Sequence, residues 1–353
     1  MPVVTVTVLL LSLVLTPHQS QTRWSLVASM LSPGTGQLAV QLHDGHVLAL
    51  GGEAVTDGFP VPTAQVYDPS TDGWHYAADM SVGRIGATAT VLRDGRVLVV
   101  GGLSPKLEAL SSTELYDPTT DTWHNTAPLS QTRFSQSATL LKDGRVLLVG
   151  GIVAGHVSNS AILYDPQTDR WSPAPSSRFV HAQQSALVLK DGSVLMVGGY
   201  GNPERYDPVR QVWSAVRMTP FRSHAVVAVL RDGSVLVASG RNAHERDLRS
   251  TRLYDPATGT WRAAGSLHAP RDQAVGVTLP NGTVLVAGGE QVTVHVLRSA
   301  EIFDPTHRVW SETASMHTPR DAAFAVPVSD GAVLVCGGMN LSGVLSSCER
   351  YDP

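Results

Sequence analysis

The apolar residues of this chain gather in short runs that recur at a nearly regular distance. Seven such runs follow an Asp-Gly or Asn-Gly pair, and each ends at a Gly-Gly or, once, at Ser239-Gly240. Examples are the runs at 97–100 and 146–149. A short continuous apolar run between turn residues is typical of a strand that is buried on both faces. The pattern therefore predicts seven buried strands, each preceded by a tight turn.

These turns and two further marks repeat in a constant order, with the turns 41 to 50 residues apart. The turns are Asp44-Gly45, Asp94-Gly95, Asp143-Gly144, Asp191-Gly192, Asp232-Gly233, Asn281-Gly282 and Asp330-Gly331. An aromatic-Asp-Pro motif follows each apolar run, at Tyr67, Tyr116, Tyr164, Tyr206, Tyr254, Phe303 and Tyr351. The only tryptophans of the chain complete the repeat, at Trp24, Trp74, Trp123, Trp171, Trp213, Trp261 and Trp310.

Each mark has a mechanical reason. Asp-Gly between apolar runs favours a hairpin, for which we expect a two-residue type I′ turn. Proline after the aromatic-Asp pair cannot donate to a β-ladder and ends the third strand. The tryptophan then begins a fourth, outer strand. Four antiparallel strands per unit, repeated seven times, predict an all-β, seven-bladed β-propeller.

The two ends of the repeat predict how the ring closes. The seventh unit ends at Tyr351-Asp352-Pro353 without a fourth strand, whereas Trp24 belongs to a fourth strand that has no first three. We therefore expect the N-terminal strand to complete the last blade, which would leave no open sheet edge.

The spacing of Gly-Gly, Tyr and Trp over residues 22–353 resembles the Kelch repeat. This resemblance implies a Kelch-type propeller whose loop-bearing faces hold proteins or glycans. It extends to the propeller of the copper-radical galactose oxidases, whose site needs a Tyr-His dipeptide and a cysteine cross-linked to a tyrosine. This sequence has no Tyr-His dipeptide, and its two cysteines both lie in the seventh unit. The resemblance thus favours the fold without that activity, and we expect no cofactor.

The N-terminus carries an apolar run at 3–15. Its length suits a secretory signal and is too short to span a bilayer. We expect a signal peptide at 1–20, a single propeller domain at 21–353, and a secreted or cell-envelope protein. A mis-assigned start or a disordered apolar tail is the alternative. No other stretch is long and apolar enough to cross a membrane, and a net charge of −4 does not favour nucleic acid.

Cys336 and Cys348 are the only cysteines and flank a short loop. If that loop is a hairpin, the two lie roughly opposite each other, and a disulfide is possible in an oxidising compartment. The alternative is a pair of unbonded, half-buried thiols.

One set of residues is a candidate ligand site. In each unit we name the strands a to d, from the propeller axis outward. Basic residues enter strand a in six units, and the first unit has Gly34 instead; they are Arg84, Arg133, His181, Arg222, Arg271 and Arg320. Three phenylalanines lie beside the equivalent connection in three consecutive units: Phe134, Phe179 and Phe221. Guanidinium groups around one mouth could bind a carboxylate or phosphate, and the aromatic rings could stack on a sugar.

Structural roles are the alternative for these residues. Four glutamates stand two residues before the aromatic of the aromatic-Asp-Pro motif and could pair with the basic residues between blades; they are Glu114, Glu204, Glu301 and Glu349. The phenylalanines could simply pack. We identify no catalytic residue and no metal ligand set: His268 and His317 fit loop hydrogen bonding, and pairs such as Asp68 and Asp72 fit turn hydrogen bonds.

The sequence thus favours a binding module over an enzyme. Because the a–b and c–d turns are short and regular, we expect the b–c and d–a loops to carry a protein or carbohydrate ligand, with the chain a monomer. Two alternatives remain: an enzyme that processes a sugar or sugar acid at the arginine-lined mouth, and a structural envelope or matrix protein.

Overall fold

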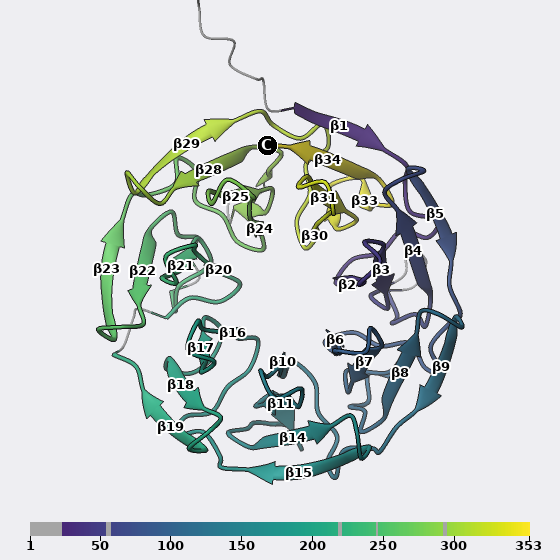
Figure 1. Cartoon of the computed structure of the whole chain (residues 1–353). Helices are drawn as coiled ribbons and strands as arrows, with labels where there is room; N and C mark the ends of the chain where they lie inside the picture. Colours follow the sequence, from purple (N-terminus) through teal and green to yellow (C-terminus); the bar gives the residue numbers. More distant parts are fainter. Residues whose placement is uncertain (1–22, 54–57, 218–220, 245, 292–294) are drawn as a thin grey trace, which may run out of the picture.

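The structure is a computed structural model that describes residues 23–53, 58–217, 221–244, 246–291 and 295–353. Figure 1 shows sheets arranged radially in a ring around a central axis. Within the described residues the strands form seven four-stranded sheets, which confirms the predicted all-β, seven-bladed propeller. The predicted signal peptide lies outside the described residues.

Six blades are continuous in the chain. Blade 1 consists of β2 (Leu38–Gln41), β3 (Val47–Leu50), β4 (Ala64–Asp68) and β5 (Gly73–Tyr76). Blade 2 consists of β6 (Thr88–Val91), β7 (Val97–Val100), β8 (Thr113–Asp117) and β9 (Thr122–Asn125). Blade 3 consists of β10 (Ser137–Leu140), β11 (Val146–Val149), β14 (Ala161–Asp165) and β15 (Arg170–Ala174). Blade 4 consists of β16 (Ser185–Val188), β17 (Val194–Val197), β18 (Glu204–Asp207) and β19 (Val212–Ala215).

Blade 5 consists of β20 (Val226–Val229), β21 (Val235–Ala238), β22 (Thr251–Asp255) and β23 (Thr260–Ala264). Blade 6 consists of β24 (Val275–Thr278), β25 (Val284–Ala287), β28 (Ala300–Asp304) and β29 (Val309–Thr313). Three b–c loops carry short hairpins: β12 (Ile152–Val153) with β13 (His156–Val157), β26 (Glu290–Gln291) with β27 (His295–Val296), and β32 (Met339–Asn340) with β33 (Gly343–Val344).

Blade 7 combines both ends of the described chain. It consists of β30 (Phe324–Pro327), β31 (Val333–Cys336), β34 (Cys348–Asp352) and the N-terminal β1 (Arg23–Val27). β1 pairs antiparallel with β34, with Trp24 opposite Tyr351, and Figure 1 shows the two strands side by side. The predicted closure is therefore confirmed. Cys336 and Cys348 are direct partners of β31 and β34 and are joined by a disulfide.

The apolar runs form the second strand of every blade and are buried on both faces, as their composition predicts. All four residues are buried in β3, β7, β11, β17, β21, β25 and β31. Their side chains meet those of the neighbouring blade: Leu48 and Leu50 of blade 1 share one apolar cluster with Val97 and Val99 of blade 2. The hydrophobic core is thus a series of seven layers between blades.

The repeated aromatic residues connect neighbouring blades. Trp74 packs on Tyr67 with ring centroids 5.2 Å apart, and its indole N–H donates to the carbonyl of Ala28 in the preceding blade, at 3.1 Å. The Tyr67 hydroxyl donates to Asp72 at 2.9 Å, and the same carboxylate accepts the Ala28 N–H at 3.0 Å. The second Asp of this pair therefore links blades as well as closing its own turn.

The a–b turns differ from the two-residue type I′ turn that we expected. Gly45 has a φ of 93°, but the φ of Asp44 is not positive, whereas type I′ needs both. The Gly45 N–H donates to Leu42 O at 3.0 Å, and the Leu42 N–H donates to His46 O at 2.8 Å. The loop therefore has three residues and ends at a left-handed glycine. Asp44 stabilises it differently, because its carboxylate accepts the His46 N–H at 3.0 Å.

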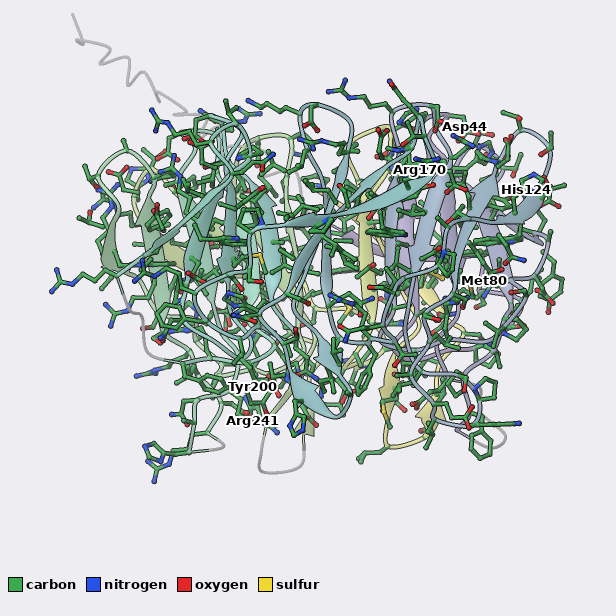
Figure 2. The ribbon with its side chains drawn as sticks, turned by 90° about the horizontal axis from the view of Figure 1, so that it is seen from below. Asp44, Met80, His124, Arg170, Tyr200 and Arg241 are labelled. Carbon is green, nitrogen blue, oxygen red and sulfur yellow. A yellow bond between two sulfur atoms is a disulfide. The ribbon has the colours of Figure 1, made fainter. Side chains whose placement is uncertain are left out.

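The two faces of the ring carry different loops. Figure 2 shows Asp44, from an a–b turn, on one face, and Tyr200 and Arg241, from b–c loops, on the opposite face. We call the latter the loop face. No helix among the described residues is long and apolar enough to span a bilayer.

Candidate functional site

The five arginines that precede strand a are buried. Their exposed fractions are 0 to 4 %, and their guanidinium groups donate to the blade that each arginine enters. Arg271 is representative: Nη1 donates to Gly288 O at 2.9 Å and to Ser299 O at 3.0 Å, and Nη2 donates to Ser299 Oγ at 3.2 Å. The other four arginines donate to the equivalent carbonyl and serine in their own blades. They are Arg84, Arg133, Arg222 and Arg320. These guanidinium groups therefore hold strands b and c together.

At most of these positions, a glutamate forms an ion pair with the basic residue. Nη2 of Arg271 is 2.8 Å from Oε1 of Glu301, and Nη2 of Arg320 is 3.1 Å from Oε1 of Glu349. Arg84 pairs with Glu114 in the same way, and Nε2 of His181 is 3.0 Å from Oε2 of Glu204. Each pair lies within one blade, so the expectation of pairing between blades is corrected. The link between blades is made by the backbone instead, as when Gly52 N–H donates to Arg84 O at 3.2 Å.

The same glutamates fix the d–a connections. Glu301 accepts the N–H groups of His268 at 2.8 Å and Ala269 at 3.2 Å, and its Oε2 is 2.9 Å from Nδ1 of His268. Glu349 accepts from His317 and Thr318 in the same way. Among the described residues, no group of three or more His, Cys, Asp or Glu side chains is placed to hold a metal ion.

Blade 1 has neither the basic residue before strand a nor the glutamate on strand c. Gln65 stands at the glutamate position and accepts the Leu31 N–H at 2.9 Å. A Cβ built on Gly34 would lie 2.4 Å from Cδ of Gln37, so the Gln37 side chain lies against this glycine. The first unit therefore stabilises its d–a connection without a charged pair.

Two arginines lack the glutamate. Ile162 and Arg252 stand at the position that Glu301 takes in blade 6, and among the described residues Arg133 and Arg222 form no ion pair. Burial, with a smaller contribution from the Arg252 charge, lowers the pKa of Arg222 to about 10. A buried cation without an anionic partner is costly, so Arg133 and Arg222 would gain more from a nearby anionic group than the paired arginines would.

Arg222 also lines a pocket between blades 4 and 5. The pocket has a volume of about 270 Å³, and Phe179, Val180, Asn202 and Phe221 contribute to its walls. Two of the three phenylalanines singled out from the sequence thus meet the same arginine. Phe134 lies elsewhere, in a β-bridge with Ile152 of blade 3.

The pocket lies beside a glycine whose Cα–Cβ direction is open, although the two blades stay joined there, since the Gly199 N–H donates to Arg222 O at 3.0 Å. A Cβ built on Gly51, Gly101, Gly150, Gly288 or Gly337 would lie 2.2 to 2.7 Å from a carbonyl oxygen of the next blade. At Gly198 the corresponding distance, to Arg222 O, is 3.9 Å. The b–c loop of blade 4 is also very short, and its Tyr200 ring lies 5.6 Å from that of Phe221. Tyr200 is 51 % and Val180 47 % exposed, so an apolar patch surrounds the pocket.

A second group of side chains on the loop face was not recognised from the sequence. Five charged residues lie where the inner strands of blades 5 to 7 meet their b–c loops. They are Arg241, Asp247, Asp272, Glu290 and Asp321. The backbone of Asp272 forms a β-bridge with Glu290, and that of Asp321 forms one with Met339. The available signal was the aspartate that directly follows Arg271 and Arg320, where other units have an uncharged residue.

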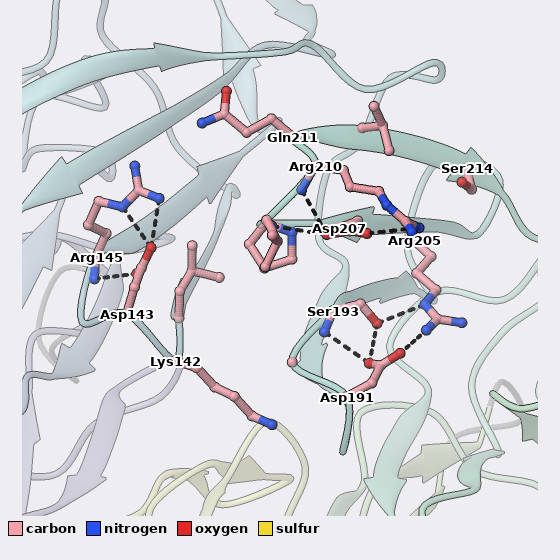
Figure 3. Close-up of a pocket in the computed structure, with 15 residues that line it drawn as sticks. Lys142, Asp143, Arg145, Asp191, Ser193, Arg205, Asp207, Arg210, Gln211 and Ser214 are labelled. Carbon is pink, nitrogen blue, oxygen red and sulfur yellow. Dashed lines mark hydrogen bonds and ion pairs between the residues drawn. The ribbon is translucent and has the colours of Figure 1, made fainter.

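The opposite face carries a larger groove, of about 1040 Å³, between blades 3 and 4 (Figure 3). Its charged side chains are paired with one another: Nη2 of Arg145 is 2.6 Å from Oδ2 of Asp143, and Arg205 pairs with Asp191. Lys142 donates to Lys190 O at 2.6 Å. The groove therefore has less unsatisfied charge than the loop face, despite its size.

Comparisons with known proteins agree with this architecture. Residues 86–130, 133–178 and 322–353 match the family model of the Kelch motif. No protein with a curated description matches the sequence. Among solved structures, the chain is similar to a fungal alcohol oxidase of the AA5 family in complex with copper, with a TM-score of 0.77 and 17 % identity. The match covers 94 % of this chain and 76 % of the oxidase, and at this identity it concerns the fold.

Proposed function

We propose that this chain, which carries Kelch motifs in a seven-bladed propeller, is a binding module. It would hold a protein or carbohydrate ligand on its loop face. The propeller supports a binding role in general terms, because it presents variable loops on a rigid frame. The observation that carries the proposal is the pocket between blades 4 and 5, one of the places at which a unit departs from the repeat.

The pocket suits one ring or one side chain of a larger ligand. Phe179 and Phe221 supply apolar walls, and Tyr200 extends them at the surface. Aromatic surface of this kind packs on sugar rings or on apolar side chains. Arg222, which has no carboxylate partner among the described residues, would favour a ligand group that carries a carboxylate.

Tyr200→Ala tests this proposal. We expect full-length wild type to bind a restricted set of members of a glycan array or a displayed peptide library, and the variant to bind them at least about tenfold more weakly, or 1.4 kcal/mol. Tyr76→Ala is the matched control, because Tyr76 is 56 % exposed on the outer strand of blade 1. Equal binding by wild type and Tyr200→Ala would contradict the proposal.

We also propose that the chain is exported and acts as a monomer outside the cytoplasm. The apolar run at 3–15 supports a signal peptide. The Cys336–Cys348 disulfide supports an oxidising compartment, where such bonds persist. N-terminal sequencing of protein recovered from the expressing cells should find a start near residue 21, and light scattering should give the mass of one chain. A cytoplasmic product that retains Met1 would contradict export.

Catalysis on a sugar or sugar acid is the second candidate function. Asp321 favours it, since burial, together with the Glu290 and Asp272 charges, raises the pKa of this carboxyl group to about 6. A pKa near neutrality suits a general acid or base. Incubation with neutral sugars, followed by NMR, would reveal a product that Asp321→Asn fails to form; an unchanged spectrum with wild type would rule against these substrates.

A further inference from the structure

One arginine on the loop face contacts three carboxylates. Nη2 of Arg241 is 3.2 Å from Oδ2 of Asp272 and 3.0 Å from Oε1 of Glu290, and its Nε is 3.2 Å from Oδ1 of Asp247. Asp272 is fully buried, whereas the Glu290 side chain is 31 % exposed. The carboxylates come from two blades, so Arg241 ties blade 5 to blade 6. One guanidinium charge among three carboxylates leaves the group negative.

Asp321 adds a fourth carboxylate from blade 7. It is 6 % exposed, and its Oδ1 has no hydrogen-bond partner among the described residues. Asp321 lies next to Glu290 in the fold, because the Gly289 N–H donates to Arg320 O at 2.9 Å. Burial, and to a lesser extent the charges of Glu290 and Asp272, raise the pKa of its carboxyl group. A buried carboxylate oxygen without a donor is costly. The position therefore favours a donor that arrives from outside the chain.

His224 does not remove the excess negative charge. Its Nδ1 is 3.3 Å from Oδ1 of Asp272, and its side chain is 39 % exposed. The hydrogen bond to Asp272 raises the pKa of His224. Even with His224 protonated, the four carboxylates named here outnumber Arg241 and His224, counted within the described residues. Gln273, whose Nε2 is 3.4 Å from Oε1 of Glu290, contributes no charge.

We propose that these four carboxylates form a binding site for an organic cation, an ammonium or guanidinium group of a ligand. Asp321 and the exposed part of Glu290 would accept its N–H groups, while Arg241 holds Asp272 and Asp247 in place. The site is separate from the Phe221 pocket and goes beyond the proposed function. It predicts a positively charged group on a second part of the ligand or on a different ligand.

An organic cation fits this arrangement better than a metal ion does. Metal ions of biological sites need several oxygen or nitrogen ligands converging on one point. No group of three or more His, Cys, Asp or Glu side chains within the described ranges is so placed. An ammonium or guanidinium group needs only separate acceptors at hydrogen-bond distance, and it can share them with Arg241.

Agmatine, which carries both an ammonium and a guanidinium group, is a suitable probe. We expect it to bind the full-length protein saturably at pH 7.5, in the millimolar range or tighter as measured by calorimetry, and Asp321→Asn to weaken binding at least about tenfold. Asp44→Asn, on the opposite face, is the matched control and should leave binding unchanged. Tyr200→Ala should also leave it unchanged, so that failure of the Phe221 pocket is distinguishable from failure of this site.

Several results would overturn the proposal: no saturable binding by wild type below about 10 mM, equal binding by Asp321→Asn, or equal loss in Asp44→Asn. Ca²⁺ that binds more tightly than agmatine and depends on Asp321 would identify a metal site instead. Should Asp321→Asn fail to fold by circular dichroism, Glu290→Gln serves as the second variant, because this partly exposed side chain accepts from Arg241 and Gln273. A tenfold loss in that variant supports the proposal, and unchanged binding contradicts it.

Discussion

Nη2 of Arg241 lies 3.2 Å from Oδ2 of Asp272, although the two residues belong to different blades. Arg241 follows β21 of blade 5, and Asp272 precedes β24 of blade 6. Asp272 is fully buried, so its charge depends on Arg241 and on the neighbouring His224. The contact is both a link between blades and the wall of the proposed cation site.

We expect Arg241→Met to destabilise the fold by about 3 kcal/mol at pH 8, because it leaves Asp272 buried beside only His224. The loss should be smaller at pH 5. The pKa of His224 is raised by its hydrogen bond to Asp272, so the pair contributes below that pKa and loses its contribution as the pH rises through it. Urea unfolding at both pH values measures this. A double variant with Asp272→Asn should recover part of the loss; equal losses at both pH values would contradict the role of His224.

Asp321→Asn should stabilise the protein at neutral pH. The folded-state pKa of Asp321 is about 6, against an ordinary value of 3.8. A raised carboxyl pKa means that the folded state favours the protonated form, so ionisation destabilises the fold progressively as the pH rises from about 4 to above 6. We expect a gain on the order of 2 kcal/mol at pH 7.5 and little difference at pH 4. A variant that is less stable than wild type at pH 7.5 would show that the ionised carboxylate has a donor.

Arg252→Glu should give Arg222 the partner that Glu301 gives Arg271. The expected result is a more stable fold, by about 1 kcal/mol, since a buried cation gains a charged hydrogen bond. The same variant should weaken binding of any carboxylate-bearing ligand to the Phe221 pocket. Arg252→Met is the control: it removes the repulsion from Arg222 without adding a partner. Binding that survives Arg252→Glu unchanged would mean that Arg222 does not contact the ligand.

Reduction of the disulfide should lower the stability of the protein to unfolding, because the bond lies in the blade that closes the ring. Cys336 and Cys348 are separated by 12 residues and join strands b and c of blade 7, the blade that β1 completes. Loop closure of this length contributes roughly 2–3 kcal/mol. Urea midpoints with and without dithiothreitol, compared with Cys336→Ser/Cys348→Ser, measure the effect. A reductant effect that persists in the double variant would have another cause.

The candidate site was only partly predictable. The sequence placed Phe179 and Phe221 beside equivalent connections of consecutive units and Arg222 next to Phe221, but it grouped them with six residues from these and other units and did not show that these three line one pocket. Whether an arginine is paired depends on the residue that faces it on strand c, which is Glu301 for Arg271 and Arg252 for Arg222. The acidic group went unrecognised because Arg241, Asp272 and Asp321 are far apart in the chain.

The repeat by itself determined the number of blades, the buried second strands and the closure by Trp24, because each follows from local turn and packing chemistry copied seven times. Tertiary structure decided what differs between copies. It also decided the a–b loop, which has three residues in every copy and takes a positive φ only at its glycine. The pocket lies beside Gly198, where a Cβ would be 3.9 Å from the carbonyl oxygen of Arg222 rather than in close contact with it. Asp321 meets Glu290 and Asp272 only because neighbouring blades bring the ends of their inner strands together. Such contacts depend on the radial packing of blades, which no single repeat encodes.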